Sequence, residues 1–517
     1  MRKIRAILFA VLIFQIAACG VKHSADRLVV AIPADITGFN PFSSTSSVDY
    51  DIYRQIYPQL FRELPDLQSV ADYLAKRWRF SGDRKQLFIV LRGDARWSNG
   101  QRVTAMDVEQ TFRWETDTTA AWPFVDSKRF IRNVQAMDDT SLLVTFSRSY
   151  PEALKDVNEG FILNREYLQK LRSGRVSGEF PPTCGPYQIE SWRPQSRIVL
   201  RKNETFWQKN ERRISEVVFE VVPDANTRLS KLLAGEVDLI DGVAPSQLDL
   251  LRGRRDLRIE HYPDLMMGFI AWNNADPLFA QAEVRRAMTL AIDRKSIIES
   301  VYRGYARECT SPILPVFWAY DSTITPIPYD PKEAGRILRT LGWRDRDGDG
   351  VLEKNRRRFA FQLLTISNNP IRREIAVIVQ NQLEKIGVQA KIQMLDFSTF
   401  VQRFRRGNFQ ALISAWKLGT KLDLRIFWHS QGTYNRIGYR NSLVDSLLDH
   451  IEKLEYPQHQ LVLWHRIQRL IYDDQPFTFL YIPEHLVAFR NRIGGYRMNF
   501  LSTFYNLGEW YLKPEEQ

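Results

Sequence analysis

Three acidic residues in one short segment have the spacing of a metal-binding loop. Asp345, Asp347 and Asp349 stand at alternate positions and are followed by Gly350. This matches the first half of a calcium loop, in which oxygen atoms at alternate positions converge on the ion. The twelfth position of such a loop needs a bidentate glutamate, but here it is Arg356. Because Asp and Gly also favour tight turns without any ion, we interpret the segment as a turn and predict no metal site.

Motifs that mark catalytic sites are missing from the sequence. It contains no G-x-S-x-G, no H-E-x-x-H, no phosphate-binding loop and no G-x-G-x-x-G. The seven histidines are scattered, and the closest two, His459 and His465, have a spacing that does not share one face of a helix. We therefore predict that the protein has no catalytic residues, is not an enzyme and carries no cofactor.

Two tryptophans lie beside polar residues that could recognise a ligand. These pairs are Trp272–Asn273 and Trp416–Lys417, in a chain that is rich in aromatic residues. Binding pockets combine apolar walls with a few fixed polar groups, so both pairs are candidates for ligand contacts. The alternative for each tryptophan is a buried core position on a strand.

The first twenty residues have the pattern of an export signal. Arg2, Lys3 and Arg5 precede an apolar run over residues 7–18, which ends in small residues before Cys19. The run is too short to cross a bilayer as a helix, and no second run of spanning length follows, so the protein is not itself a permease. We predict a signal peptide over residues 1–18.

The junction at Cys19 resembles the lipobox of bacterial lipoproteins. Membership of that class implies a diacylglycerol-modified Cys19, a lipidated tether over residues 19–26 and stable anchoring of an exported protein to a membrane. The alternative is an ordinary cleaved signal. The other two cysteines, Cys184 and Cys309, form either one disulfide, which an oxidising compartment would permit, or two buried thiols.

The composition is that of a globular protein. The chain has 517 residues, of which 44% are hydrophobic and 26% charged, and a net charge of +12. Its basic residues are scattered along the chain rather than gathered in one stretch, which is typical of a solvated surface. We therefore predict no nucleic-acid partner.

Strand and helix signals alternate along the chain. Residues 27–33 read as a strand, a loop rich in Gly, Asn, Pro and Ser covers 37–44, and residues 50–61 have helical spacing. Thr104 and Asp107 form a capping box for a helix through Phe112.

The clearest local signals come later in the chain. Asp330 and Pro331 start a helix that Gly342 ends, and a helical pattern from Ile371 stops at Gly387 before a strand. These alternations predict a mixed α/β fold.

Six ordered segments of the sequence resemble family 5 of the extracytoplasmic solute-binding proteins of ABC importers, which includes peptide-, dipeptide- and nickel-binding members. The segments cover nearly the whole chain after the signal. They are Leu91–Val108 (LRGDARWSNGQRVTAMDV), Cys184–Tyr187 (CGPY), Arg201–Trp207 (RKNETFW), Leu233–Asp238 (LAGEVD), Val284–Arg294 (VRRAMTLAIDR) and Tyr329–Trp343.

The resemblance implies a bilobed periplasmic-binding-protein-like fold of type II, cluster C type, with an inserted third domain. Lobe I would comprise residues 27–44, 161–262 and 487–517, the inserted domain residues 45–160, and lobe II residues 263–486. The implied protein is a periplasmic or extracytoplasmic monomer that closes on a peptide or other medium-sized polar solute and delivers it to an ABC permease. Alternatives are a ligand sensor that feeds a signalling partner and, less favoured, a secreted hydrolase.

The sequence departs from peptide-binding members of the family at one ligand-contacting position. Those members carry an aspartate three residues after the tryptophan matching Trp416, and it pairs with the free α-amino group of the ligand. Here the position is Gly419, flanked by Lys417 and Lys421, with Asp423 further on. A lysine there could meet a carboxylate or phosphate. The predicted ligand-binding residues are Phe42, Ser43, Trp272, Asn273, Trp416, Lys417 and Asp423.

Overall fold

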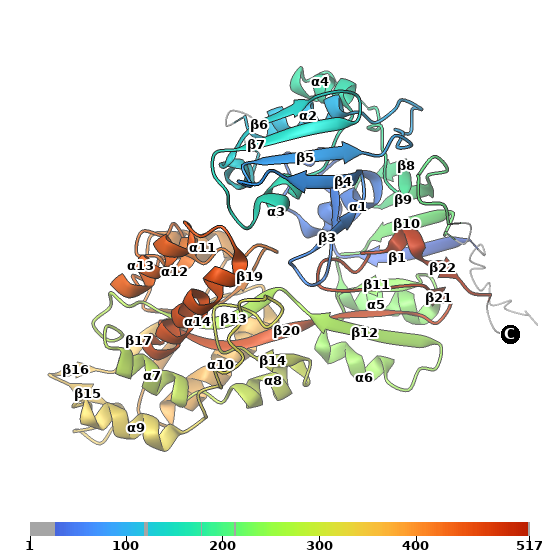
Figure 1. The fold of residues 1–517 in the computed structure, drawn as a ribbon. Helices are drawn as coiled ribbons and strands as arrows, with labels where there is room; N and C mark the ends of the chain where they lie inside the picture. Colours follow the sequence, from blue (N-terminus) through green and yellow to red (C-terminus); the bar gives the residue numbers. More distant parts are fainter. Residues whose placement is uncertain (1–25, 118–121, 177, 211–212, 515–517) are drawn as a thin grey trace, which may run out of the picture.

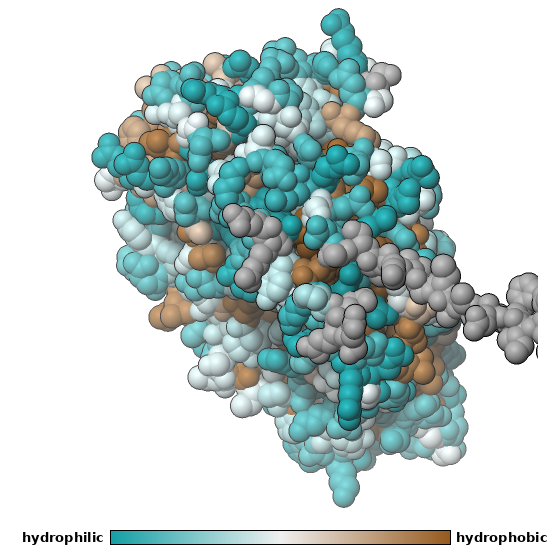
Figure 2. Space-filling view, turned by 90° about the vertical axis from the view of Figure 1, so that its right-hand side faces the viewer, coloured by the Kyte–Doolittle hydropathy of each residue, from teal (hydrophilic) through white to brown (hydrophobic). Residues whose placement is uncertain are grey.

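The computed structural model describes residues 26–117, 122–176, 178–210 and 213–514. The predicted signal peptide and Cys19 lie outside these ranges. Within them, no helix is both long enough and apolar enough to cross a membrane. On the face shown in Figure 2, coloured apolar side chains lie singly or in small groups among hydrophilic ones.

One large sheet runs through both lobes (Figure 1). Among the described residues it has 12 strands, with the central order β18-β17-β19-β13-β20-β11-β1-β10-β9-β8. β20 (Phe477–Arg490) joins the two halves: its first part pairs with β13 (Met266–Trp272) and its last part with β11 (Leu239–Asp241) and β12 (Leu257–Pro263). The chain also crosses between the lobes where β12 leads into β13.

Lobe I is built around β1 (Arg27–Ile32), which pairs in parallel with β10 and β11. Its run of Leu, Val, Ala and Ile is buried, as expected for a strand covered on both faces. The remaining elements of lobe I are β8 (Tyr187–Arg193), β9 (Arg197–Lys202), β10 (Glu216–Val221), α5 (Ala225–Ala234), η3 (Pro245–Gln247), α6 (Leu248–Leu251), β21 (Ile493–Gly494), η4 (Leu507–Glu509) and β22 (Tyr511–Leu512).

The inserted domain has its own antiparallel sheet, in the order β4-β5-β7-β6, and a hydrophobic core separate from that of lobe I. Helix α1 falls within the range predicted for this domain, but its buried side chains pack into the core of lobe I. The elements between the first two lobe I segments are α1 (Ser47–Ile56), β2 (Phe61–Glu63), β3 (Val70–Asp72), β4 (Ala75–Phe80), β5 (Gln86–Leu91), α2 (Ala105–Glu115), η2 (Val125–Lys128), β6 (Ile131–Ala136), β7 (Ser141–Phe146) and α3 (Ala153–Asn158). Helix α4 (Arg165–Arg172) follows in the second segment, and its Tyr167 and Leu168 pack into the core of lobe I.

Lobe II surrounds its part of the large sheet with helices (Figure 1). Two hydrophobic clusters fill it. Its other elements are α7 (Ala282–Leu290), α8 (Arg294–Tyr302), β14 (Ala306–Glu308), α9 (Pro331–Thr340), β15 (Glu353–Lys354), β16 (Arg357–Arg358), β17 (Ala360–Ile366), α10 (Pro370–Glu384), β18 (Gln389–Leu395), α11 (Phe397–Arg405), β19 (Ala411–Lys417), α12 (Arg425–Trp428), α13 (Ser442–Ile451) and α14 (Pro457–Asp474).

Local capping signals predicted several helices correctly. Thr104 and Asp107 form the capping box of α2, and the Asp330 side chain accepts a hydrogen bond from the N–H of Glu333 at the start of α9. The helix predicted over residues 50–61 was wrong at its end. α1 stops at Ile56, because Pro58 disfavours helical backbone at the preceding residue, Tyr57, which is extended.

The structure favours two buried thiols over the possible disulfide. Cys184 and Cys309 are both free and buried. Cys184 packs in the core of the inserted domain and Cys309 in a core of lobe II, so the two thiols belong to different bodies. Burial raises the pKa of each thiol, that of Cys309 to about 12, and this keeps both protonated and unreactive.

Candidate functional site

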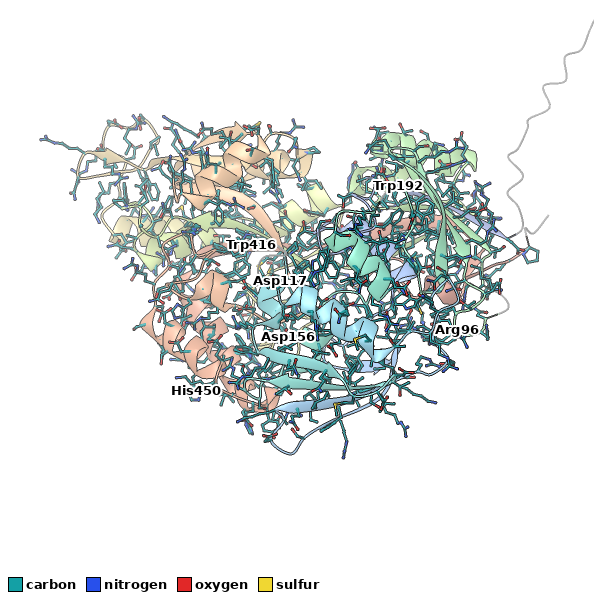
Figure 3. All side chains as sticks on the ribbon, turned by 90° about the horizontal axis from the view of Figure 1, so that it is seen from above. Arg96, Asp117, Asp156, Trp192, Trp416 and His450 are labelled. Carbon is teal, nitrogen blue, oxygen red and sulfur yellow. The ribbon has the colours of Figure 1, made fainter. Side chains whose placement is uncertain are left out.

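A cavity of about 790 Å³ lies where lobe II faces the inserted domain and helix α1. One wall comes from residues 50–160 and the other from Phe317 and residues 415–434. In the view from above, Trp416 of lobe II and Asp156 of the inserted domain lie near the middle of the molecule, where these bodies meet (Figure 3). The cavity is therefore an interlobe cleft, made of segments far apart in the sequence.

Trp416 forms the centre of the lobe II wall. Strand β19 is buried at its start and emerges from the sheet near Lys417, so Trp416 is half-buried at the strand's end. Its ring stacks on Phe427 with a centroid distance of 4.2 Å and meets the edges of Phe269 and Phe477 at 4.7 and 5.0 Å. These neighbours hold the indole in one orientation and leave its other side to the cleft.

The opposite wall combines aromatic and charged side chains. Tyr50 and Phe124 form an edge-to-face pair with a centroid distance of 6.0 Å, and Glu63 and Lys155 lie beside the same cavity. Burial raises the pKa of Glu63. Lys155 donates a hydrogen bond of 3.1 Å to the carbonyl of Thr420, so the two walls touch here.

Lys421 forms ion pairs between the walls. Its Nζ lies 2.7 Å from Asp156 Oδ1 and 2.8 Å from Glu159 Oε2, both on the inserted-domain side. Burial alone lowers the pKa of a lysine, but the carboxylates of Glu159 and Asp156 outweigh this and raise the pKa of Lys421. Lys421 therefore stays charged and is already paired; of the two lysines that could meet a carboxylate or phosphate, Lys417 is the exposed one.

A buried lysine fixes the two carboxylate-bearing residues. Lys128 Nζ donates hydrogen bonds of 2.7 Å to the backbone carbonyls of Asp156 and Glu159, and it pairs at 2.9 Å with Glu115. The side chains of Lys128 and Glu115 are each 1% exposed. Because a fully buried charge must keep its partners, this arrangement holds the end of α3 in place.

Three of the predicted ligand-binding residues line the cleft: Trp416, Lys417 and Asp423. The Lys417 ammonium is exposed and lies 3.6 Å from Asp264. Asp423 is open to the cleft, yet the surrounding protein desolvates it and raises its pKa. Their contact with a ligand remains a prediction.

The other four predicted residues lie away from the cavity lining. Trp272 is fully buried in the core of lobe II and donates a hydrogen bond to Thr478, which is the core position left open as its alternative. Asn273 donates to the carbonyl of Phe409, Phe42 stacks on Trp114, and Ser43 is exposed and donates to the carbonyl of Asn40.

The acidic segment around Asp345 has the bonds of a turn. Asp345 accepts hydrogen bonds of 2.8 and 3.0 Å from the N–H groups of Gly348 and Gly350, and Asp349 pairs with Arg358. One oxygen from each of the three carboxylates lies within 4.8 Å of the others, on an exposed surface. The backbone bonds account for the aspartates as turn residues. The absence of a metal remains a prediction.

A histidine–aspartate pair lies where β20 passes between the lobes. His485 Nε2 lies 2.7 Å from Asp241 Oδ1, which also accepts a hydrogen bond of 2.6 Å from Thr503. Burial lowers the pKa of His485, but the Asp241 carboxylate outweighs it and raises that pKa above its ordinary value. The pair therefore ties β20 to β11 near the point where the lobes join.

Two lobes joined by paired strands around a cleft define a bilobed binding protein. Residues 70–436, more than half of the chain, match the family "Bacterial extracellular solute-binding proteins, family 5 Middle". The protein belongs to this family, and the mixed α/β, bilobed fold predicted from the sequence is confirmed.

Individual relatives are similar in sequence to this chain over most of its length. The chain is 27% identical over 508 residues to the oligopeptide-binding protein AppA of Bacillus subtilis (strain 168), covering 96% of this chain and 93% of that protein. The structure of AppA in complex with a nonapeptide matches with a TM-score of 0.77 at 26% identity, covering 94% of this chain and 99% of AppA. Heme-binding protein A of Haemophilus influenzae is 25% identical over 471 residues, covering 85% of this chain and 84% of that protein.

Proposed function

We propose that the protein captures a peptide-like or other medium-sized polar solute between its lobes and presents it to the membrane permease of an ABC importer. The observation that carries this proposal is the interlobe cavity of about 790 Å³. Ligand sites in proteins usually have volumes of roughly 300–1,000 Å³ and combine apolar walls with a few polar groups. The likeness to AppA, whose structure holds a nonapeptide, supports a peptide-like cargo.

The cleft geometry suits capture by closure rather than catalysis. Trp416, Tyr50 and Phe124 offer aromatic surface on facing walls, and Lys417 and Asp423 offer charges of opposite sign. A solute that contacts both walls stabilises the closed arrangement by its differential affinity for it. Such a closed form is the state a permease would recognise, and it requires no chemical step.

Mild purification followed by native mass spectrometry tests this function. We expect the folded protein to retain a peptide-like solute, or to bind members of a random peptide library at micromolar or lower concentration. A protein that neither carries a solute nor retains any library member would contradict the proposal.

We further propose that a lipid on Cys19 tethers the protein to the membrane. The sequence of the N-terminal segment supports this, and tethering would raise the effective concentration of the protein near its permease. Replacing Cys19 with serine should release the protein from the membrane fraction while its solute affinity is unchanged. If the Cys19→Ser protein stays with the membrane, the lipid proposal fails.

A further inference from the structure

The ammonium group of Lys421 lies beside two acidic side chains of the cleft that the cationic group of a solute would otherwise contact. Asp156 and Glu159 belong to α3 and the residue after it, and both face lobe II across the cleft. Two adjacent carboxylates repel each other unless a cation lies between them. Lys421 Nζ provides that cation, at 2.7 and 2.8 Å.

The acid pair is held in position independently of Lys421. Lys128 binds the backbone carbonyls of both residues from inside the inserted domain, and Glu115 neutralises Lys128. Gly160 follows Glu159 with a φ of +95°, and a side chain there would overlap Glu115. If Lys421 were removed, Asp156 and Glu159 would therefore remain close together as an unoccupied anionic site.

We propose that Lys421 is a specificity-determining residue. Its ammonium occupies the anionic site formed by Asp156 and Glu159, so the protein prefers solutes that have no ammonium group at this position. The inference rests on the proposed function. An ammonium that reached this part of the cleft would be desolvated beside a lysine and without a free acidic partner. Peptides with a blocked amino terminus avoid that cost.

The other acidic residues of the cleft do not replace this site. Glu63 has a raised pKa and lies near the cations of Arg54 and Lys155. Asp423 also has a raised pKa and accepts the N–H of Arg425, and Asp126 is exposed. Glu159 lines the cavity of about 790 Å³, and Asp156 lines the neighbouring cavity; Lys421 lines both and lies between the two carboxylates.

Lys421 also links the two bodies, so its role extends to closure. Arg129 pairs with Glu452 at 2.9 Å, and Arg148 donates to the carbonyl of the same residue, so further links remain when Lys421 is lost. We therefore expect replacement of Lys421 to shift the balance between open and closed forms and not to abolish closure.

The first test compares two libraries of the same random peptides, one with free and one with acetylated amino termini. Each is incubated with wild type, Lys421→Ala and Lys421→Met, and the retained peptides are counted by mass spectrometry. We expect both variants to shift retention toward free-amino peptides by at least tenfold relative to wild type. Lys231→Ala is the matched control, because Lys231 also bridges two carboxylates, Glu220 and Glu236, but within lobe I. An unchanged ratio in both Lys421 variants would overturn the proposal.

The second test needs no solute. Small-angle scattering should give a larger radius of gyration for Lys421→Ala than for wild type, and methylammonium chloride should reverse the change where equal sodium chloride does not. The double variant Asp156→Asn, Glu159→Gln should not respond to methylammonium. If wild type retains no peptide at all, the proposed function is contradicted, but the scattering measurement still decides the role of Lys421. An equal response to both salts would overturn that role.

Discussion

Trp416 and Lys421 lie on one short segment of lobe II and supply two different kinds of contact. Trp416 is held by Phe269, Phe427 and Phe477, so its indole is an ordered apolar surface. Lys421 is held by carboxylates of the other body, so it is part of the wall and not a free charge. Neighbouring residues of the cleft therefore differ in whether they are free to meet a solute.

Gly160 is predicted to be essential for the geometry of the acidic wall. Its φ of +95° already disfavours a side chain, and an added Cβ would overlap Glu115 Oε1. Gly160→Ala should lower the free energy of unfolding by about 2–4 kcal/mol, because the left-handed backbone and the clash both contribute. The matched control is Gly253→Ala, which has a φ of +81° but open space around the Cβ, and should lose only about 1–2 kcal/mol. Urea unfolding measures the loss of free energy of unfolding in each variant. Equal losses in the two variants would contradict the prediction, because the clash with Glu115 would then add nothing.

The two buried cysteines are predicted to be free thiols. In a Cys19→Ser protein purified without reductant, a thiol reagent should label neither Cys184 nor Cys309 in the folded state and both after denaturation. Labelling of neither residue after denaturation would instead indicate a disulfide.

At the scale of elements, β20 joins the two lobes because it pairs with strands of both. Its first residues pair with β13 and β14, and its later residues pair with β11 and β12. His485 lies on β20 where the partners change, and its ring stacks on Tyr262 of β12 with a centroid distance of 5.2 Å. The polar pair of His485 with Asp241 thus stabilises the crossing itself.

This pair gives a pH dependence with a defined sign. The raised pKa of His485 means that its contribution to stability is complete below the unfolded value of 6.5 and is lost as pH rises through the folded pKa. The lowered pKa of Asp241, which burial opposes and His485 favours, means that its contribution is lost only as pH falls below about 3.8. A charge-assisted hydrogen bond contributes about 1.5–3 kcal/mol.

His485→Gln should therefore remove the decline in the free energy of unfolding that wild type shows as pH rises from about 6.5 through the folded pKa of His485. Urea titrations at several pH values measure it, and His450→Gln, at an exposed position on α13, is the control that should keep the wild-type profile. A decline that persists in His485→Gln would assign the pH dependence to other groups.

Elements with strong local signals could be predicted from the sequence. The capping residues of α2 and α9 and the glycine after α10 act within a few residues, so their effect does not depend on the rest of the fold. The end of α1 was missed because helical periodicity outweighed Pro58 in the prediction. Trp272 and Trp416 could not be told apart, because both lie at or next to the end of a strand, and only tertiary packing buries Trp272 and leaves Trp416 at the cleft.

At the scale of the whole molecule, the cleft is assembled from three bodies. Lobe II contributes one wall, and the inserted domain with α1 contributes the other. Trp416, Lys417 and Asp423 could be predicted because they are close in sequence and the family resemblance drew attention to them. Glu63, Lys155 and Glu159 could not, because Glu63 lies on β2 and the other two lie on or directly after α3, and only the tertiary fold brings these elements to the cleft.

The most direct test of solute binding between the lobes is a tryptophan fluorescence titration with a peptide library. Wild type should show a saturable change that is lost in Trp416→Phe. Trp192→Phe, which removes an indole bonded to Asp35 in lobe I, should keep the change. Figure 3 shows Trp192 well apart from Trp416. No saturable change with any peptide in wild type, or an undiminished change in Trp416→Phe, would contradict binding in this cleft.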